Sequence, residues 1–242
     1  FTIGLVLPPL THWEWVENLY EGMWEAMQEF GGEIIGGDCS CGETKMISIT
    51  AIGEMNQLRL HRGNAVPGDY IVSTGFHGLS RLGLALLRSE HLPSKVQISP
   101  NLTNRAINAH KRPYPALEAL KALKECKPDS TSWRAAGTDS SDGLIESIRG
   151  ICESSDCQAV LSKTSILKDP DWPEDSIWDE WILNGGEDYE LILTLPKEWA
   201  EALSKNFKHA QIIGFIKKGK PSISWDNLEP INIEQSSLFQ HF

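Results

Sequence analysis

The sequence predicts a mixed protein of the α/β (α+β) class. Strand-like and helix-like hydrophobic patterns alternate along the whole chain. The sequence contains no internal repeat and no low-complexity tract. With 242 residues, of which 40% are hydrophobic and 23% charged, it has the composition of an ordinary globular protein of one large or two small domains.

The first elements have clear boundaries. Thr2–Leu7 reads as a short buried strand that ends at Pro8 and Pro9. Apolar residues at helical spacing then predict a helix that reaches Phe30, with Thr11 as its N-cap and two glycines after its end. Met46–Ile52 alternates apolar and small residues, which indicates a returning strand.

The rest of the chain continues the alternation after a turn-rich break at residues 63–69. This break is the best candidate for a domain boundary, so we expect domains at residues 1–66 and 67–242. The strands expected after the break are Tyr70–Gly75, Ala135–Asp139, Tyr189–Leu195 and Ala210–Phe215. The helices expected after it are Leu79–Arg88, Ala116–Cys126, Leu144–Cys152 and Lys197–Asn206.

Charge and cysteine content exclude several classes of protein. The 22 basic and 33 acidic residues give a net charge of −11 without a basic cluster, so nucleic acid is not an expected partner. No apolar run approaches the ~20 residues that cross a bilayer, so no membrane association is expected. The five cysteines are an odd, scattered set, which indicates reduced thiols and a cytoplasmic location. Cys39 and Cys41 are interpreted as small loop residues, with a metal or redox site as the alternative.

Three acidic turns framed by glycine stand out, each expected at the end of a strand. They contain Asp38, then Asp139 and Asp142, then Glu187. Carboxylates are hard oxygen ligands that suit Mg²⁺, and the free N–H groups at a helix start, beside Ser141, suit phosphate oxygens. Each turn alone could be a helix cap or a loop. Together, in an acidic chain, they indicate phosphate chemistry assisted by a divalent metal.

Signatures of other enzyme classes are absent from the sequence. It has no Walker-type phosphate loop, no protein-kinase catalytic or metal-binding triplet, no nucleophile elbow and no zinc-protease motif. His61, His77 and His110 accompany no serine or cysteine signature, so they are interpreted as loop residues or residues adjacent to substrate.

The order of the motifs along the chain carries a resemblance. Gly36-Gly-Asp38, His61-Arg62 with Pro67-Gly-Asp69, Thr74-Gly75, His110-Lys-Arg-Pro113, Asp139-Ser-Ser-Asp-Gly-Leu144 and Gly185-Gly-Glu-Asp-Tyr-Glu-Leu191 follow one another. This series resembles the thiamine-monophosphate kinase family over essentially the whole chain, and the aromatic end Leu238–Phe242 is similar to that family's C-terminus. The two longest motifs are the specific ones.

The resemblance implies an activity and a fold. The activity is the ATP-dependent, Mg²⁺-assisted transfer of a phosphoryl group onto thiamine monophosphate, which gives thiamine diphosphate. The fold is that of the aminoimidazole-ribonucleotide-synthetase-like superfamily, with an N-terminal α/β domain that pairs in a homodimer and a C-terminal α+β domain.

The resemblance also implies roles for nine residues. The Mg²⁺ ligands, and with them the catalytic residues, would be Asp38, Asp139 and Asp142. The residues at ATP would be Tyr20, Gly37, Arg62 and Ser141. The residues at the thiamine substrate would be Glu187 and Phe239.

Two departures from the family keep alternatives open. Family members begin with a further segment carrying a Gly-Asp-Asp motif and a Thr-Thr-Asp strand, which nothing here matches, so we expect an N-terminally truncated chain with an incomplete first domain. The family also often places an aspartate where Leu79 stands. The alternatives are a non-catalytic nucleotide-binding fragment and a related enzyme of the superfamily that acts on another phosphorylated substrate.

Overall fold

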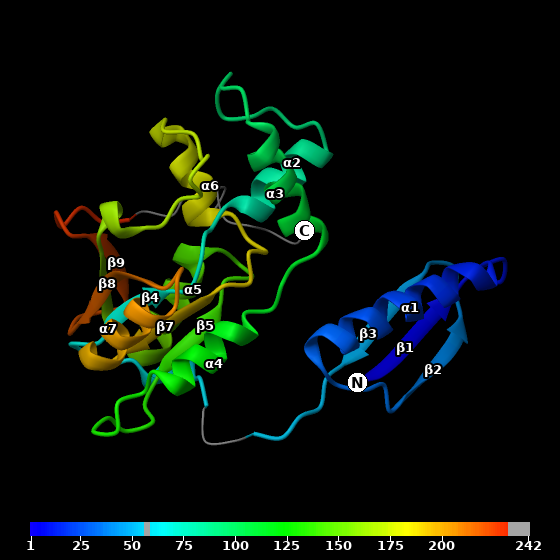
Figure 1. Ribbon diagram of the computed structural model, residues 1–242, viewed down its shortest axis with the longest axis horizontal. Coiled ribbons are helices and arrows are strands. Elements are labelled where there is room, and N and C mark those ends of the chain that lie inside the picture. The colour runs from blue at the N-terminus through cyan, green and yellow to red at the C-terminus, as the bar shows by residue number, and fades with distance from the viewer. Residues whose placement is uncertain (56–58, 232–242) are drawn as a thin grey trace. The chain divides into compact units, whose positions relative to one another are not determined.

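The computed structural model describes residues 1–55 and 59–231. The chain divides into two compact units, Phe1–Asn56 and Gln57–Phe242, which are described separately below (Figure 1). Among the described residues, no helix combines the length and the apolar character needed to cross a membrane.

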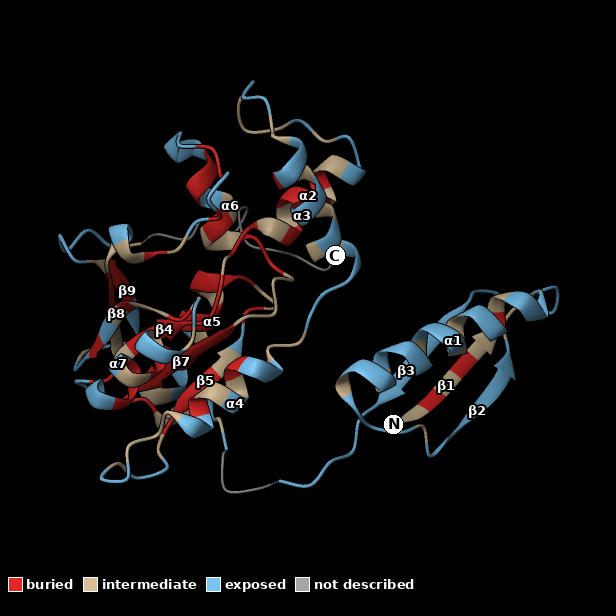
Figure 2. Ribbon diagram, in the orientation of Figure 1, coloured by how far each residue is buried: buried red, intermediate tan, exposed pale blue. Residues whose placement is uncertain are grey.

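The first unit is a three-stranded sheet with one helix. β1 (Thr2–Leu7) lies in the middle, parallel to β2 (Gly36–Cys41) and antiparallel to β3 (Met46–Thr50). The connection from β1 to β2 contains α1 (Trp13–Phe30). Ile3 and Leu5 on β1 are buried, whereas every residue of β2 and β3 is exposed (Figure 2).

Two predictions in this unit are wrong in detail. Gly36, Gly37 and Asp38 do not form a turn but begin β2, in register with Thr2 to Gly4. The glycine serves close strand approach, because a Cβ on Gly37 would lie 1.9 Å from the carbonyl oxygen of Ile3. The N-cap of α1 is His12, without a side-chain capping bond, and not Thr11.

The second unit is built on a mixed six-stranded sheet in the order β5-β7-β4-β8-β6-β9. Neighbouring strands are antiparallel except β6 and β9, which are parallel. The strands are β4 (Tyr70–Ser73), β5 (Ala136–Asp139), β6 (Gln158–Leu161), β7 (Leu191–Leu195), β8 (Gln211–Lys217) and β9 (Ser222–Trp225).

Helices cover this sheet and form two cores. The α-helices are α2 (Leu79–Leu87), α3 (Pro100–Lys111), α4 (Leu117–Glu125), α5 (Leu144–Ser155), α6 (Asp179–Asn184) and α7 (Lys197–Asn206), and the 3₁₀ turns are η1 (Arg62–Asn64), η2 (Lys163–Ser165) and η3 (Ser176–Trp178). Ile71 belongs to the core that contains α5, and its neighbour Val72 to the core that contains Trp199 of α7. Successive residues of β4 therefore serve opposite faces of the sheet, as the two-residue period of a strand requires.

The predicted fold class is confirmed: both units mix helices with sheets, and both sheets combine parallel and antiparallel pairs. The helices and strands expected from the sequence are present with ends shifted by a few residues. Four further elements, α3, α6, β6 and β9, are not predicted by the sequence pattern.

Candidate functional site

The first acidic turn of the second unit lies between β5 and α5. Asp139 is the last residue of β5 and is exposed, and Asp142 precedes the helix. Ser147 fixes the turn from inside the helix, because its hydroxyl donates to the carbonyl oxygens of Asp139 at 2.9 Å and Gly143 at 2.8 Å. Gly143 has a φ of 102°, a conformation that favours glycine. The turn thus presents two carboxylates from a rigid base.

The second acidic turn, residues 185–190, packs directly on the first. The backbone N–H of Glu187 donates to the carbonyl oxygen of Ser141 at 2.7 Å, and the N–H of Glu190 donates to the buried Ser140 hydroxyl at 3.0 Å. The turns meet because β5 and β7 are neighbours, with Asp139 opposite Leu191. We call residues 139–143 and 185–190 the paired turns. The structure therefore brings Ser141 and Glu187 together.

The charges of the paired turns act on Tyr189 of the second turn. The pKa of its phenol is raised first by burial and then by the negative charges of Glu187, Asp139 and Asp142. Three of the predicted site carboxylates thus act on one ring, which places a negative electrostatic field over the paired turns.

Arg62 adds a cation beside this field. Its Nε and Nη2 donate to the hydroxyl of Thr138 at 3.1 and 2.9 Å, and Thr138 in turn donates to the carboxylate of Asp139 at 3.3 Å. The Arg62 side chain also lies against Gly150 of α5. Of the predicted site residues, Arg62, Asp139, Ser141, Asp142 and Glu187 therefore belong to one region of the second unit.

The donor set of the paired turns fits a hard divalent cation. Within the described part of the chain, no group of three or more His, Cys, Asp or Glu side chains could hold a metal ion by itself. Mg²⁺ needs no such group, since it commonly takes one or two carboxylates and completes its shell with water and substrate phosphates. Asp139, exposed at the end of β5, offers oxygens of this kind.

Three predicted site residues lie in the first unit. Tyr20 is half-buried on α1, and Gly37 and Asp38 are exposed on β2. The carboxylate of Asp38 accepts the backbone N–H of Cys39 at 2.9 Å. Cys39 and Cys41 are exposed free thiols on the same strand. Phe239 lies outside the described residues.

A buried polar network that the sequence did not predict lies at the second turn. The Asp188 carboxylate accepts the backbone N–H of Gly78 at 2.7 Å and of Ser80 at 3.0 Å. Burial raises the pKa of Asp188 to about 7; its two hydrogen bonds act against this shift, and the charges of Glu190 and Glu187 add to it. Only the local sequence signal Gly-Gly-Glu-Asp pointed to this residue, since its partners lie more than a hundred residues earlier.

Two histidines extend the network. His77 is buried, its Nε2 lies 2.8 Å from the Ser73 hydroxyl, and burial lowers its pKa to about 4. Its Nδ1 faces the Asp188 carboxylate at 3.9 Å. His110 lies with its Nδ1 3.0 Å from the Ser80 hydroxyl and 3.5 Å from the Glu187 carboxylate. His110 therefore does lie beside a predicted substrate residue, whereas His77 belongs to the interior.

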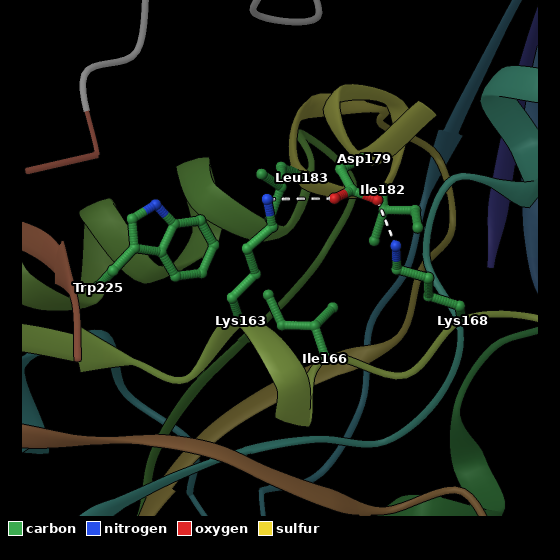
Figure 3. Close-up of a pocket in the computed structure, with 7 residues that line it drawn as sticks. All are labelled: Lys163, Ile166, Lys168, Asp179, Ile182, Leu183 and Trp225. Atoms are coloured by element: carbon green, nitrogen blue, oxygen red, sulfur yellow. Dashed lines mark hydrogen bonds and ion pairs between the residues drawn. The ribbon is translucent and has the colours of Figure 1, made fainter. Parts of the chain in front are cut away.

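A pocket of the second unit involves other residues (Figure 3). In Figure 3, Lys163 and Lys168 approach the Asp179 carboxylate from two sides, and Lys163 forms an ion pair with it at 3.4 Å. The complete lining is Lys163, Ile166, Lys168, Asp179, Ile182, Leu183 and Trp225. Since one carboxylate already holds both ammonium groups and the lining includes none of the predicted site residues, the pocket is not the candidate site.

Comparison with known proteins identifies the family. The model of the AIR synthase related protein N-terminal domain matches residues 1–55. A thiamine-monophosphate kinase of Prochlorococcus marinus is 45% identical over 241 residues, which cover 100% of this chain and 72% of that protein.

Solved structures agree. The crystal structure of thiamine monophosphate kinase from Aquifex aeolicus superposes with a TM-score of 0.78 at 25% identity, over 96% of this chain and 74% of that one. A structure of AaThiL complexed with AMPPCP and TMP superposes with a TM-score of 0.74 at 22% identity, over 100% of this chain and 72% of that one. Because it is 45% identical to the Prochlorococcus protein over 100% of its own residues and 72% of that protein, this chain belongs to the thiamine-monophosphate kinase family.

Proposed function

We propose that this protein transfers the γ-phosphoryl group of ATP directly to the phosphate of thiamine monophosphate. A phosphate oxygen of the acceptor forms the new bond to the γ-phosphorus, the bond from that phosphorus to the β–γ bridging oxygen breaks, and ADP leaves. The observation that carries the proposal is the 45% identity to a thiamine-monophosphate kinase over the whole chain. The AaThiL structure, which contains AMPPCP and TMP, supports ATP and thiamine monophosphate as the two substrates.

The paired turns would hold the phosphates. Asp139 and Asp142 would ligate Mg²⁺, which when bound neutralises phosphate charge and aligns donor with acceptor. Asp38 is a further proposed Mg²⁺ ligand. The support from the geometry is that Asp139 and Asp142 lie on one short turn between β5 and α5, which the second turn contacts through the bond from the Glu187 N–H to the Ser141 carbonyl oxygen. Because the acceptor phosphate is already ionised, the reaction needs no general base.

The remaining residues would bind the organic parts and the ATP phosphates. Arg62 would contact the ATP phosphates, and its two bonds to Thr138 support this role by fixing the guanidinium beside Asp139. Ser141, Gly37 and Tyr20 would contact ATP. Glu187, and Phe239 beyond the described residues, would contact the thiamine moiety.

We propose further that the protein is cytoplasmic and, when full length, a homodimer. All five cysteines are free thiols, which supports a reducing compartment.

The test is an assay of the full-length protein for thiamine diphosphate from thiamine monophosphate, Mg²⁺ and ATP. Formation of thiamine diphosphate that stops when Mg²⁺ is chelated is the expected result. ATP binding without transfer would favour the non-catalytic alternative. Transfer only to a different phosphorylated acceptor would favour another enzyme of the superfamily.

A further inference from the structure

Asp188 occupies an unusual place in the paired turns. It lies between Glu187 and Tyr189, whose φ angles are 64° and 54°. Residues other than glycine rarely adopt this left-handed backbone conformation. Each one costs on the order of 1 kcal/mol or more, which interactions with the surrounding structure must offset. The side chain of Asp188 is 3% exposed, whereas that of Glu187 is 32% exposed. Asp188 is thus a buried side chain between two residues with a strained backbone conformation.

The two hydrogen bonds of Asp188 use both oxygens of its carboxyl group. Gly78 donates to Oδ2 and Ser80 donates to Oδ1, so each oxygen receives one backbone N–H. Both donors stand at the start of α2, where the first N–H groups have no partner within the helix and favour an anion. Asparagine offers one oxygen and one NH₂ group, which would place two donors against each other at one of these positions.

The surroundings of Asp188 are unfavourable for an ionised carboxylate. Burial and the neighbouring charges of Glu190 and Glu187 disfavour its ionised form. Glu190 is itself fixed by the Thr74 hydroxyl at 2.6 Å, and the buried His77 ring faces Asp188 at 3.9 Å. We explain the cost of burying the Asp188 carboxylate by its effect, which is to fix the conformation of residues 187–189.

We propose that Asp188 is a positioning residue of the substrate site: by binding Gly78 and Ser80 it fixes the turn to α2 and so holds Glu187 in the orientation that meets the thiamine moiety. This rests on the proposed function, because the role of Glu187 at the thiamine is part of it. Asp188 itself would not touch the substrate.

The kinetic test compares two variants of the full-length protein. Asp188→Asn should raise KM for thiamine monophosphate about tenfold while kcat and KM for ATP change by less than about threefold, since the binding of one substrate is affected. The matched control is Asp69→Asn. Asp69 is an equally buried carboxylate directly before β4. It accepts the N–H of Val66 and a hydrogen bond from Arg134. The Asp69→Asn variant should be less stable than the wild type but keep its KM for thiamine monophosphate within about twofold of the wild-type value.

Hydrogen exchange tests the positioning independently of activity. In the wild-type protein the amides of Gly78 and Ser80 should exchange slowly, although first-turn amides lack helical partners. Asp188→Asn should speed exchange in segments 76–80 and 185–190, and Asp69→Asn should not.

The outcomes separate the two proposals. A wild-type protein that makes no thiamine diphosphate would overturn the proposed function, and the exchange data would then decide the anchoring alone. Fast exchange of Gly78 and Ser80 in the wild type, or an Asp188→Asn variant with unchanged KM and exchange, would overturn the role of Asp188. If Asp188→Asn does not fold, the wild-type exchange still decides.

Discussion

The backbone N–H of Glu187 donates to the carbonyl oxygen of Ser141 at 2.7 Å. This bond joins two turns that lie far apart in the sequence and that carry the proposed metal and substrate residues. Because β5 and β7 are adjacent and antiparallel, the end of one strand and the start of the other occupy the same edge of the sheet. The proposed metal ligands and the proposed substrate residue therefore share one rigid base.

Removing either carboxylate of the first turn should stop catalysis and spare the fold. We expect Asp139→Asn and Asp142→Asn each to lower the Mg²⁺-dependent turnover at least about a hundredfold, because charge stabilisation by a bound metal contributes several kcal/mol. The measurement is thiamine diphosphate formation against Mg²⁺ concentration, with thermal unfolding of each variant. Asp129→Asn, at an exposed loop aspartate, is the control and should keep the wild-type rate. Near-wild-type turnover in either variant at the paired turns would show that the ligand assignment is wrong.

Arg62 should act on ATP rather than on stability. Arg62→Gln removes the charge and the two bonds to Thr138, so we expect KM for ATP to rise about tenfold with a small change in melting temperature. Arg149→Gln is the control, because Arg149 forms ion pairs only with Glu146 and Glu153 among the described residues, on the surface of α5. Equal effects of the two substitutions on KM would contradict a specific role for Arg62.

Gly37 should tolerate no side chain. An added Cβ would meet the Ile3 carbonyl oxygen at 1.9 Å, so we expect Gly37→Ala to destabilise the first unit by about 2 kcal/mol or more. Nothing lies within 4 Å of a Cβ on the neighbouring Gly36, which makes Gly36→Ala a control with an effect under about 1 kcal/mol. Denaturant unfolding measures both values. Two equally stable variants would mean that β2 does not pair with β1 in this register.

The pH dependence of stability should show the buried His77. Burial lowers the pKa of His77 to about 4 in the folded protein, whereas its pKa in the unfolded chain is 6.5. Stability from neutral His77 is therefore fully present above pH 6.5 and is lost as the pH falls to 4, by roughly 3 kcal/mol.

Asp188 acts with the opposite sign in nearly the same window. Its folded pKa is raised to about 7, so its contribution favours the folded state as the pH falls from 7 towards 3.8. The free energy of unfolding of the wild-type protein should therefore depend only weakly on pH in this range. His77→Gln should gain stability relative to wild type between pH 7 and 4.5, measured by urea unfolding at each pH. A difference that is constant with pH would contradict a buried neutral His77.

The sequence predicted the paired turns well because their chemistry is local. A carboxylate after a strand, then glycine, then a helix is a pattern that three or four neighbouring residues determine, as at Asp139 to Gly143. That the two turns touch could not be predicted from such patterns, since it depends on the sheet order. Asp188 escaped for the same reason: its partners are backbone N–H groups, which every sequence offers.

The elements that were missed or wrong have weak or ambiguous signals. Helix α3 buries only Leu102 and Ala106, so its hydrophobic stripe is thin. Strands β6 and β9 have four residues each, too few to establish a period. Gly36 and Gly37 are equally typical of a turn and of a strand that lies close to another backbone, and only the pairing with β1 decides between them.

The position of β4 has a consequence for biosynthesis. This strand, residues 70–73, lies at the centre of the larger sheet, and both of its partners, β7 and β8, come more than a hundred residues later. β4, α2 and α3 emerge from the ribosome long before β7 and β8 are synthesised. Their apolar faces therefore stay exposed during much of synthesis. β4 can pair with both of its neighbours only after Lys217 has emerged, which gives this unit the slow, non-local folding of a high-contact-order topology.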